Sequence, residues 1–371
     1  MTGYRIADQS VEEALERRFH VMDGYIELGF PTYVIAVRGV GDEMRLLKEG
    51  FKLLVEELRP LGYIPKLMRV DGRYRITVVQ RPPSSPPRHT LNVVLLAATA
   101  GTIFFDGFLR SNNPVLTKAL MPGTPAFVNA LLFTLAILGI FGLHELGHKA
   151  VTLLRGTEAS MPYFIPAPPG MGGTFGAVIT QKEPPTNRDA LFDLGFSGPF
   201  VGFLITVIVS IVGLRLSFTV SPGEVDAWMA AFPEIQFQAI NFPLLIGAIA
   251  SILKPEAEGM VMVLHPLGFA AWVGCIVTFI NLIPTWQLDG GHMSRALVGE
   301  RHHGILSMAG IALMFISGFW IMAIMISFLM MRSRVKSGAP LDDISPLSAS
   351  RKALFLVYLA MMVLTMVTLP F

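Results

Sequence analysis

Long apolar runs constrain the fold of this chain more than any other feature. The run NALLFTLAILGIF, for example, lies within a stretch of residues 126–154 that carries few charges. A helix needs about 20 predominantly apolar residues to cross a bilayer. Only 15% of the residues are charged and 52% are hydrophobic, whereas soluble domains carry about 25% charged residues. The sequence therefore predicts a polytopic α-helical membrane protein that is integral to the bilayer.

About six membrane helices are predicted from these runs, over residues 90–109, 126–154, 189–215, 263–283, 305–331 and 353–371. The apolar stretch 240–253 is short for a crossing, and we expect it to be interfacial or re-entrant. The stretch MPYFIPAPPGMGGTFGAVIT, residues 161–180, is too rich in proline and glycine for a membrane helix. Because irregular backbone at membrane depth is tolerated only inside protein or beside a water cavity, we expect it to lie in such a place.

The first 85 residues differ in composition and predict a small soluble α+β domain. EEALERRF and DEMRLLKEGFKLLVEELRPLG are typical of helices, and YVIAVRG is typical of a strand. YIPKLMRV and RYRITVVQ, joined by Asp71-Gly72, predict a β-hairpin. With no catalytic constellation, residues 1–85 are predicted to be a docking or regulatory domain. The linker RPPSSPPRH leads into a membrane domain over residues 86–371, with its core at 90–300.

Charge and cysteine content exclude several other classes of protein. The net charge is only +2 and no basic tail is present, which argues against nucleic acid as a partner. The single cysteine, Cys275, cannot form an internal disulfide and is predicted to be a small core residue. The polar N-terminal stretch has no signal-peptide core, so the soluble domain is expected in the cytoplasm. Basic residues at 149, 155, 182 and 188 agree with that orientation, whereas those at 332–336 and 351–352 oppose it.

The pentapeptide HELGH, residues 144–148, introduces chemistry into one of the apolar runs. On a helix, His144 and His148 lie on nearly the same face and can bind one metal ion. Zinc lowers the pKa of a coordinated water to about 7, and the adjacent Glu145 carboxylate can take its proton. The alternative is a buried histidine pair beside an ion-paired glutamate.

A catalytic zinc commonly has three protein ligands, so a third ligand is needed from elsewhere. Asp289, in NLIPTWQLDGGH, is the best candidate, although it could instead cap or turn the chain. It follows the run 263–283. The C-terminal end of that run lies at the same depth in the membrane as HELGH if residues 240–253 do not cross the bilayer. His292 and His265 are rival ligands, and His302 and His303 are expected on a solvated face.

Taken together, HELGH, GGTFGAV and NLIP with LDG resemble the site-2 protease family of intramembrane zinc metalloproteases. The resemblance covers residues 91–297 and is greatest to the archaeal and chloroplast branch. It implies one zinc ion per chain, bound by His144, His148 and Asp289, with Glu145 as the base. It also implies that Asn281 steadies the oxyanion, a role its side-chain amide suits; a helix C-cap is the alternative.

In that branch the glycine-rich element resembles a re-entrant hairpin beside the active site. A strand edge there could hold an unwound substrate by β-augmentation. The corresponding residues are Gly173, Thr174, Phe175 and Gly176. A tight turn with packing duties only is the alternative.

The resemblance implies hydrolysis of peptide bonds within or near transmembrane segments of membrane proteins. The substrate would be a transmembrane protein or peptide in the lipid bilayer. A membrane metal transporter and an inactive scaffold use the same ligand types and remain alternatives. A transporter ordinarily needs ligands along a path, and a scaffold would commonly have lost one of the ligands.

Overall fold

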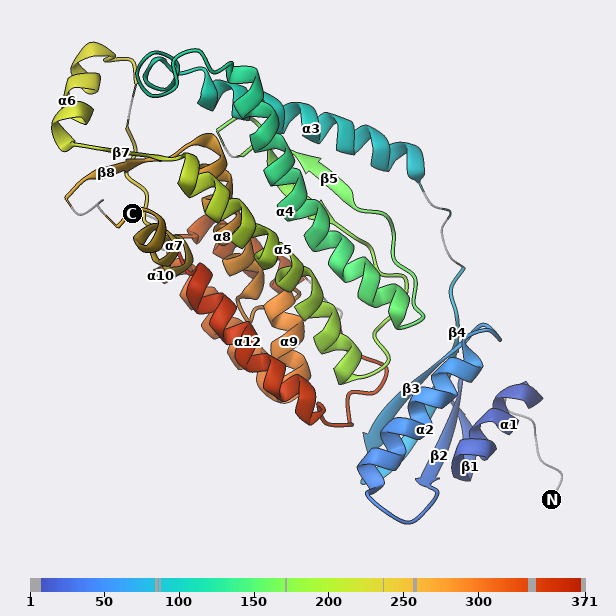
Figure 1. Cartoon of the computed structure of the whole chain (residues 1–371). Coiled ribbons are helices and arrows are strands. Elements are labelled where there is room, and N and C mark those ends of the chain that lie inside the picture. Colours follow the sequence, from blue (N-terminus) through green and yellow to red (C-terminus); the bar gives the residue numbers. More distant parts are fainter. Residues whose placement is uncertain are drawn as a thin grey trace.

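The computed structural model consists of a bundle of long helices with a small sheet-containing domain at one end (Figure 1). It describes residues 8–83, 86, 88–170, 172–235, 237–255, 259–332 and 338–367. Parts of several predicted segments lie outside the described residues. They are residues 1–7 of the N-terminal domain, positions 84, 85 and 87 of the linker, Met171 of the glycine-rich stretch, the basic residues within 333–337, and residues 368–371 of the last predicted helix.

The N-terminal domain is an antiparallel sheet covered by two helices. In chain order it contains α1 (Gln9–Arg18), β1 (Phe19–Glu27), β2 (Phe30–Val37), α2 (Glu43–Leu58), β3 (Tyr63–Val70) and β4 (Arg73–Gln80). The strand order is β1-β2-β4-β3. One apolar face of α2, including Leu47, Phe51 and Leu54, is fully buried in the domain core. The predicted helices and the hairpin over β3 and β4 are confirmed.

Strand β1 was not predicted. Its sequence FHVMDGYIE contains Asp23-Gly24, a pair that usually marks a turn. The structure instead has a register shift between Val21 and Asp23 where β1 pairs with β2. A β-bulge of this kind lets the strand continue through a turn-like pair.

Within the described part of the chain, three helices are long and apolar enough to cross a membrane: α3 (His89–Ser111), α4 (Ala126–Leu154) and α5 (Arg188–Leu216). Their bounds agree with the first three predicted membrane helices. A glycine allows α4 and α5 to approach closely, because a Cβ on Gly147 would lie 2.8 Å from the backbone oxygen of Ser197. The π-helical turn η1 (Val115–Leu120) lies between α3 and α4.

The remaining predicted membrane helices are shorter than expected. The stretch 263–283 forms α8 (Pro266–Leu282), of 17 residues. The last predicted helix, 353–371, corresponds to α12 (Ala349–Thr365), which begins before residue 353 and ends at Thr365. The prediction of one helix over 305–331 is wrong, because the chain forms α10 (Glu300–Ile316) and α11 (Trp320–Arg332). Gly318 lies between them at φ 84°, a left-handed conformation that interrupts a helix.

Short elements connect these helices. Within 240–253 the chain forms α7 (Leu244–Leu253), whose 10 residues span roughly 15 Å and cannot cross a bilayer. This agrees with the prediction that the stretch is not a full span. The other connecting elements are β7 (Phe218–Val220), α6 (Pro222–Ala231), β8 (Val261–Val263) and α9 (Asp289–Val298).

The glycine-rich stretch forms an antiparallel hairpin of β5 (Tyr163–Pro166) and β6 (Thr174–Val178). The hairpin packs along α3. The side chain of Asn92 donates to the backbone oxygen of Pro162 at 2.9 Å, and the Thr102 hydroxyl donates to that of Gly173 at 2.7 Å. Irregular backbone in the bundle is therefore covered by a neighbouring helix.

The sheet domain contacts the end of the bundle where α4 ends and where α5 and α12 begin (Figure 1). The described residues 338–348, which precede α12, join the two parts. The Leu67 amide of β3 donates to the backbone oxygen of Leu341 at 2.9 Å, and the Asp342 amide donates to that of Thr186 at 3.0 Å. Leu341 is also buried in the core of the sheet domain.

Candidate metal centre

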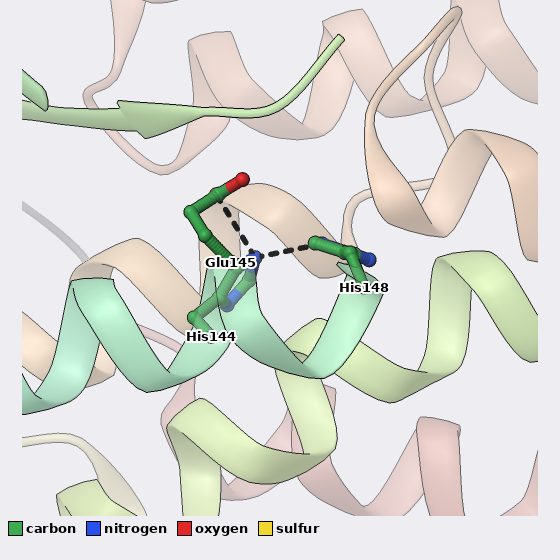
Figure 2. A group of neighbouring side chains, drawn as sticks. All are labelled: His144, Glu145 and His148. Carbon is green, nitrogen blue, oxygen red and sulfur yellow. Dashed lines mark hydrogen bonds and ion pairs between the residues drawn. The ribbon is translucent and has the colours of Figure 1, made fainter. Parts of the chain in front are cut away.

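The two histidines of HELGH lie on one face of α4 and are both buried. Their Nε2 atoms are 3.1 Å apart. Figure 2 shows the imidazole of His148 directed toward that of His144, with Glu145 beside them. The spacing of four residues therefore produces the paired imidazoles that the sequence predicts.

Asp289, the first residue of α9, completes a triangle of donor atoms. Its Oδ2 lies 3.3 Å from His144 Nε2, and its Oδ1 lies 3.3 Å from His148 Nε2. A tetrahedral zinc with bonds of about 2.0–2.2 Å holds its donor atoms roughly 3.3–3.6 Å apart. The three side chains therefore fit a zinc ion in donor type, and their spacings of 3.1–3.3 Å lie at or just below that range.

A tight turn between α8 and α9 brings Asp289 to the histidines. The two glycines after Asp289 allow this turn. A Cβ on Gly290 would lie 2.1 Å from the backbone oxygen of Leu282, and one on Gly291 would lie 2.4 Å from that of Trp286. Larger residues at these positions would clash with the backbone of the turn itself.

The orientation of His148 is set by α5. Its Nδ1 lies 2.8 Å from the backbone oxygen of Leu194. Since a carbonyl oxygen only accepts, Nδ1 carries a proton, which leaves Nε2, the atom that faces Asp289 and His144, as the metal-binding nitrogen. Gly198 faces the same ring, and a Cβ there would lie 2.1 Å from Nε2. The sequence reasoning missed Leu194 and Gly198; the pair Gly198-Pro199 inside an apolar helix was the available signal.

Glu145 lies beside the ligand triangle rather than within it. Its Oε1 is 3.9 Å from His144 Nε2, and the residue is buried. The backbone N–H of Ile179, the residue after β6, interacts with this carboxylate. Glu145 therefore lies between the candidate metal ligands and the end of the hairpin.

The remaining predicted residues lie in α8 and in the hairpin. Asn281 is half-buried in the last turn of α8. The Thr174 hydroxyl donates to the backbone oxygen of Ile165 at 2.9 Å and accepts from the Gly176 amide at 3.0 Å, so it closes the hairpin. Phe175 between them is 59% exposed.

The rival histidines have other environments. His265 caps α8, with Nδ1 accepting from the Leu267 amide at 3.0 Å and Nε2 lying 3.1 Å from Asn129 Oδ1. His292 lies in α9 with its ring against Gly338. His302 is exposed as expected, but the expectation of a solvated His303 is wrong.

His303 is only half-exposed because α9 and its own helix, α10, both cover it. Its ring nitrogens lie 3.4 Å from the hydroxyls of Ser294 and Ser307.

The fold and the site together define a helical membrane protein with a candidate zinc-peptidase centre.

Comparison with known proteins identifies the family. Residues 132–325 match the model of peptidase family M50, and the chain belongs to this family, the site-2 protease family that the motifs resemble. No solved structure matches the chain.

Curated relatives include chloroplast proteins of plants. "Probable zinc metalloprotease EGY2, chloroplastic" of Arabidopsis thaliana is 29% identical over 67% of this chain and 44% of its own length. EGY1 of the same plant, named likewise, is 30% identical over 65% of this chain and 43% of its own length. EGY3 of Oryza sativa subsp. japonica is 27% identical over 76% and 48%. The matches span less than half the length of these relatives.

Proposed function

We propose that this protein is an intramembrane zinc metalloprotease, which hydrolyses peptide bonds within or near transmembrane segments of membrane proteins. One observation carries the proposal. The donor atoms of His144, His148 and Asp289 lie 3.1–3.3 Å apart, with the Glu145 carboxylate beside them. This is the constellation of a hydrolytic zinc site, and α4, which carries three of its residues, is apolar enough to span a bilayer.

The proposed mechanism assigns proton transfer to Glu145. His144, His148 and Asp289 would hold a zinc ion, which would supply a Lewis acid for the scissile carbonyl and would acidify a water molecule. Glu145 takes a proton from the attacking water as the oxygen of that water bonds to the carbonyl carbon. As the C–N bond breaks, Glu145 gives that proton to the leaving amine nitrogen. We assign to the Asn281 amide a hydrogen bond to the developing oxyanion.

We further propose that β6 binds the substrate as an added strand. The N–H of Ile179 bonds to Glu145, whereas both backbone groups of the next residue, Thr180, bond to Ser160 on the β5 side of the hairpin. Because backbone groups alternate along a strand, the N–H of Ala177 shares that direction. Phe175 is the extra residue of a bulge, since Ile165 pairs with Gly176 and Pro166 pairs with Thr174. A substrate helix must unwind before a protease can reach its peptide bonds, and an edge of this kind supplies replacement backbone hydrogen bonds. Residues 173–176 form the start of this edge.

The same ligands would serve a membrane metal transporter or an inactive scaffold. Among the described residues, the potential metal ligands gather at one place, where Asp289 lies beside His144, Glu145 and His148, whereas a transporter ordinarily needs ligands along a path. The intact base Glu145 and ligand set favour an enzyme over a scaffold. Metal flux in proteoliposomes without peptide hydrolysis would favour the transporter.

For the topology, we propose six crossings in total, with α3, α4 and α5 as the first three. The sheet domain would lie in the cytoplasm, on the side where α4 ends. Residues 1–85 would then act as a docking or regulatory domain on the same side as the metal centre.

The function is tested by the variant Glu145→Gln in purified full-length protein. We expect wild type and variant to bind one zinc ion each, because glutamine leaves the ligand triangle intact. Only the wild type should cleave a single-span substrate, and a zinc chelator should abolish that cleavage. Removing a general base costs roughly 100- to 10,000-fold in rate. Cleavage by Glu145→Gln at the wild-type rate would contradict the mechanism.

A further inference from the structure

Two ionisable residues lie one turn apart near the end of the apolar helix α3, away from HELGH. Asp106 is 1% exposed, and its Oδ2 accepts from Arg110 Nε at 2.8 Å. Charged residues in membrane helices are costly and usually functional. The pair belongs neither to the metal centre nor to the contact with the sheet domain.

Both residues bind one backbone position at the tip of the β5–β6 hairpin. The Gly170 amide donates to Asp106 Oδ1, and the Arg110 guanidinium donates to the Gly170 carbonyl oxygen at 3.1 Å. The ion pair thus satisfies both polar groups of a single residue. The Arg110 guanidinium also lies 3.8 Å from the ring centroid of Phe269 in α8. The tip is therefore held between α3 and α8.

A second contact with α3 lies just before β6. Gly173 lies directly on α3, where a Cβ would be 2.4 Å from the Cα of Ile103. Its carbonyl oxygen accepts from the Thr102 hydroxyl at 2.7 Å. Strand β6 begins at the next residue and ends one residue before Ile179, whose N–H interacts with Glu145. One end of β6 is thus fixed to α3, and its other end faces the candidate base.

We propose that Asp106 and Arg110 are positioning residues that set the register of the β6 edge relative to the metal centre. The proposal rests on the proposed proteolytic function and adds a determinant of which bond is cut. A substrate strand paired with β6 takes its position from β6. A shift of the hairpin tip would shift β6, and every peptide bond of the substrate would then move relative to Glu145. Without the ion pair, several neighbouring bonds can reach the centre in turn.

The test uses the full-length double variant Asp106→Leu/Arg110→Met. Replacing both charges together avoids leaving one buried charge unpaired, and apolar replacement of a buried pair is often tolerated. The control is Ser111→Ala, which removes a buried hydroxyl of α3 that bonds only within its own helix, at 2.6 Å to the Gly107 carbonyl. Zinc stoichiometry, cleavage positions by mass spectrometry, and hydrogen exchange of residues 163–179 are measured.

We expect the double variant to keep one zinc ion, to cut at several adjacent bonds, and to cut roughly 10- to 100-fold more slowly. Exchange in residues 163–179 should become faster. Ser111→Ala should behave as wild type. A single unchanged cleavage site with wild-type exchange would overturn the proposal.

Two further outcomes remain decisive. If the double variant loses zinc, Arg110→Lys keeps the charge but loses the fork that reaches Asp106 and Gly170 together, and the same measurements apply to it. If the wild type binds zinc but cleaves no substrate, the proteolytic function fails. Faster exchange of the hairpin in the double variant would then support only the contact of Asp106 and Arg110 with the hairpin tip. Unchanged exchange would overturn that contact as well.

Discussion

At the residue scale, the candidate ligands are positioned largely by residues that have no side chain. Gly198 and Gly202 of α5 face the rings of His148 and His144, where a Cβ would lie 2.1 Å and 3.1 Å from a ring nitrogen. Helix α5 therefore lies close enough for the Leu194 carbonyl to orient His148. The ligand geometry depends on backbone approach as much as on the ligands.

Asp289→Asn should weaken zinc binding by more than about 100-fold. Even the loss of a group that only hydrogen-bonds to a metal ligand lowers metal affinity by about 10- to 100-fold. The amide keeps the shape of the carboxylate and removes its charge. Affinity is measured by competition with a zinc chelator. Asp226→Asn on the exposed face of α6 is the matched control and should not change affinity. Equal affinities in the two variants would exclude Asp289 as a ligand.

Gly198→Ala should also abolish stoichiometric zinc binding, because the added methyl would occupy the position of the His148 ring. The control is Gly139→Ala in α4, where the nearest atom to a new Cβ is 3.9 Å away. Zinc content after dialysis distinguishes them. A zinc-replete Gly198→Ala protein would mean that α5 does not approach His148 as closely as described.

At the element scale, helix ends and turns decide what reaches the centre. Helix α8 ends at Leu282, and the following turn delivers Asp289. The carbonyl oxygen of Leu282 accepts from the Tyr358 hydroxyl of α12 at 2.8 Å, which anchors that end. At the start of α8, His265 has a capping role that separates it from the metal ligands.

His265→Ala should destabilise the protein without loss of zinc. The variant removes the acceptor for the Leu267 amide, and loss of an N-cap costs about 1 kcal/mol. It also leaves the buried Asn129 without this partner. Thermal unfolding in detergent should begin at a lower temperature, while zinc stoichiometry remains one. Zinc loss at unchanged stability would instead restore His265 as a rival ligand.

At the scale of the whole molecule, the sheet domain is joined to the elements of the candidate site. Glu183, after β6, has a side chain only 3% exposed, and Arg59 Nε lies 3.0 Å from its Oε2. Arg81 pairs with the same carboxylate. Arg59 also donates to the Gly156 carbonyl just past α4, at 2.8 Å. Movement of the domain would therefore act on both the metal-ligand helix and the hairpin.

Glu183→Gln should loosen this contact, because two arginines lose their shared carboxylate. We expect protease cleavage within residues 81–88 to become about tenfold faster, which corresponds to about 1.4 kcal/mol. Glu13→Gln, which alters an exposed pair within the domain, should have no effect. Equal cleavage rates in the two variants would mean that Glu183 does not secure the domain.

Local patterns predicted much of this architecture. The bounds of α4 and the hairpin over β3 and β4 follow from apolar length and from Asp71-Gly72, which are properties of neighbouring residues. The break at Gly318 and strand β1 were missed for a related reason. Glycine is tolerated within helices, and Asp-Gly is tolerated within bulged strands. The surrounding structure therefore decides whether the chain breaks or continues at such residues.

By itself the sequence determined the apolar helices, the two-histidine face of α4 and the candidacy of Asp289. These depend on composition and on a spacing of four residues, which any helix converts into one face. Only the tertiary structure decided that Leu194 orients His148 and that Asp106, 64 residues before Gly170, holds the hairpin tip. Such contacts join distant segments through backbone groups that every residue carries, so no residue type in the sequence marks them.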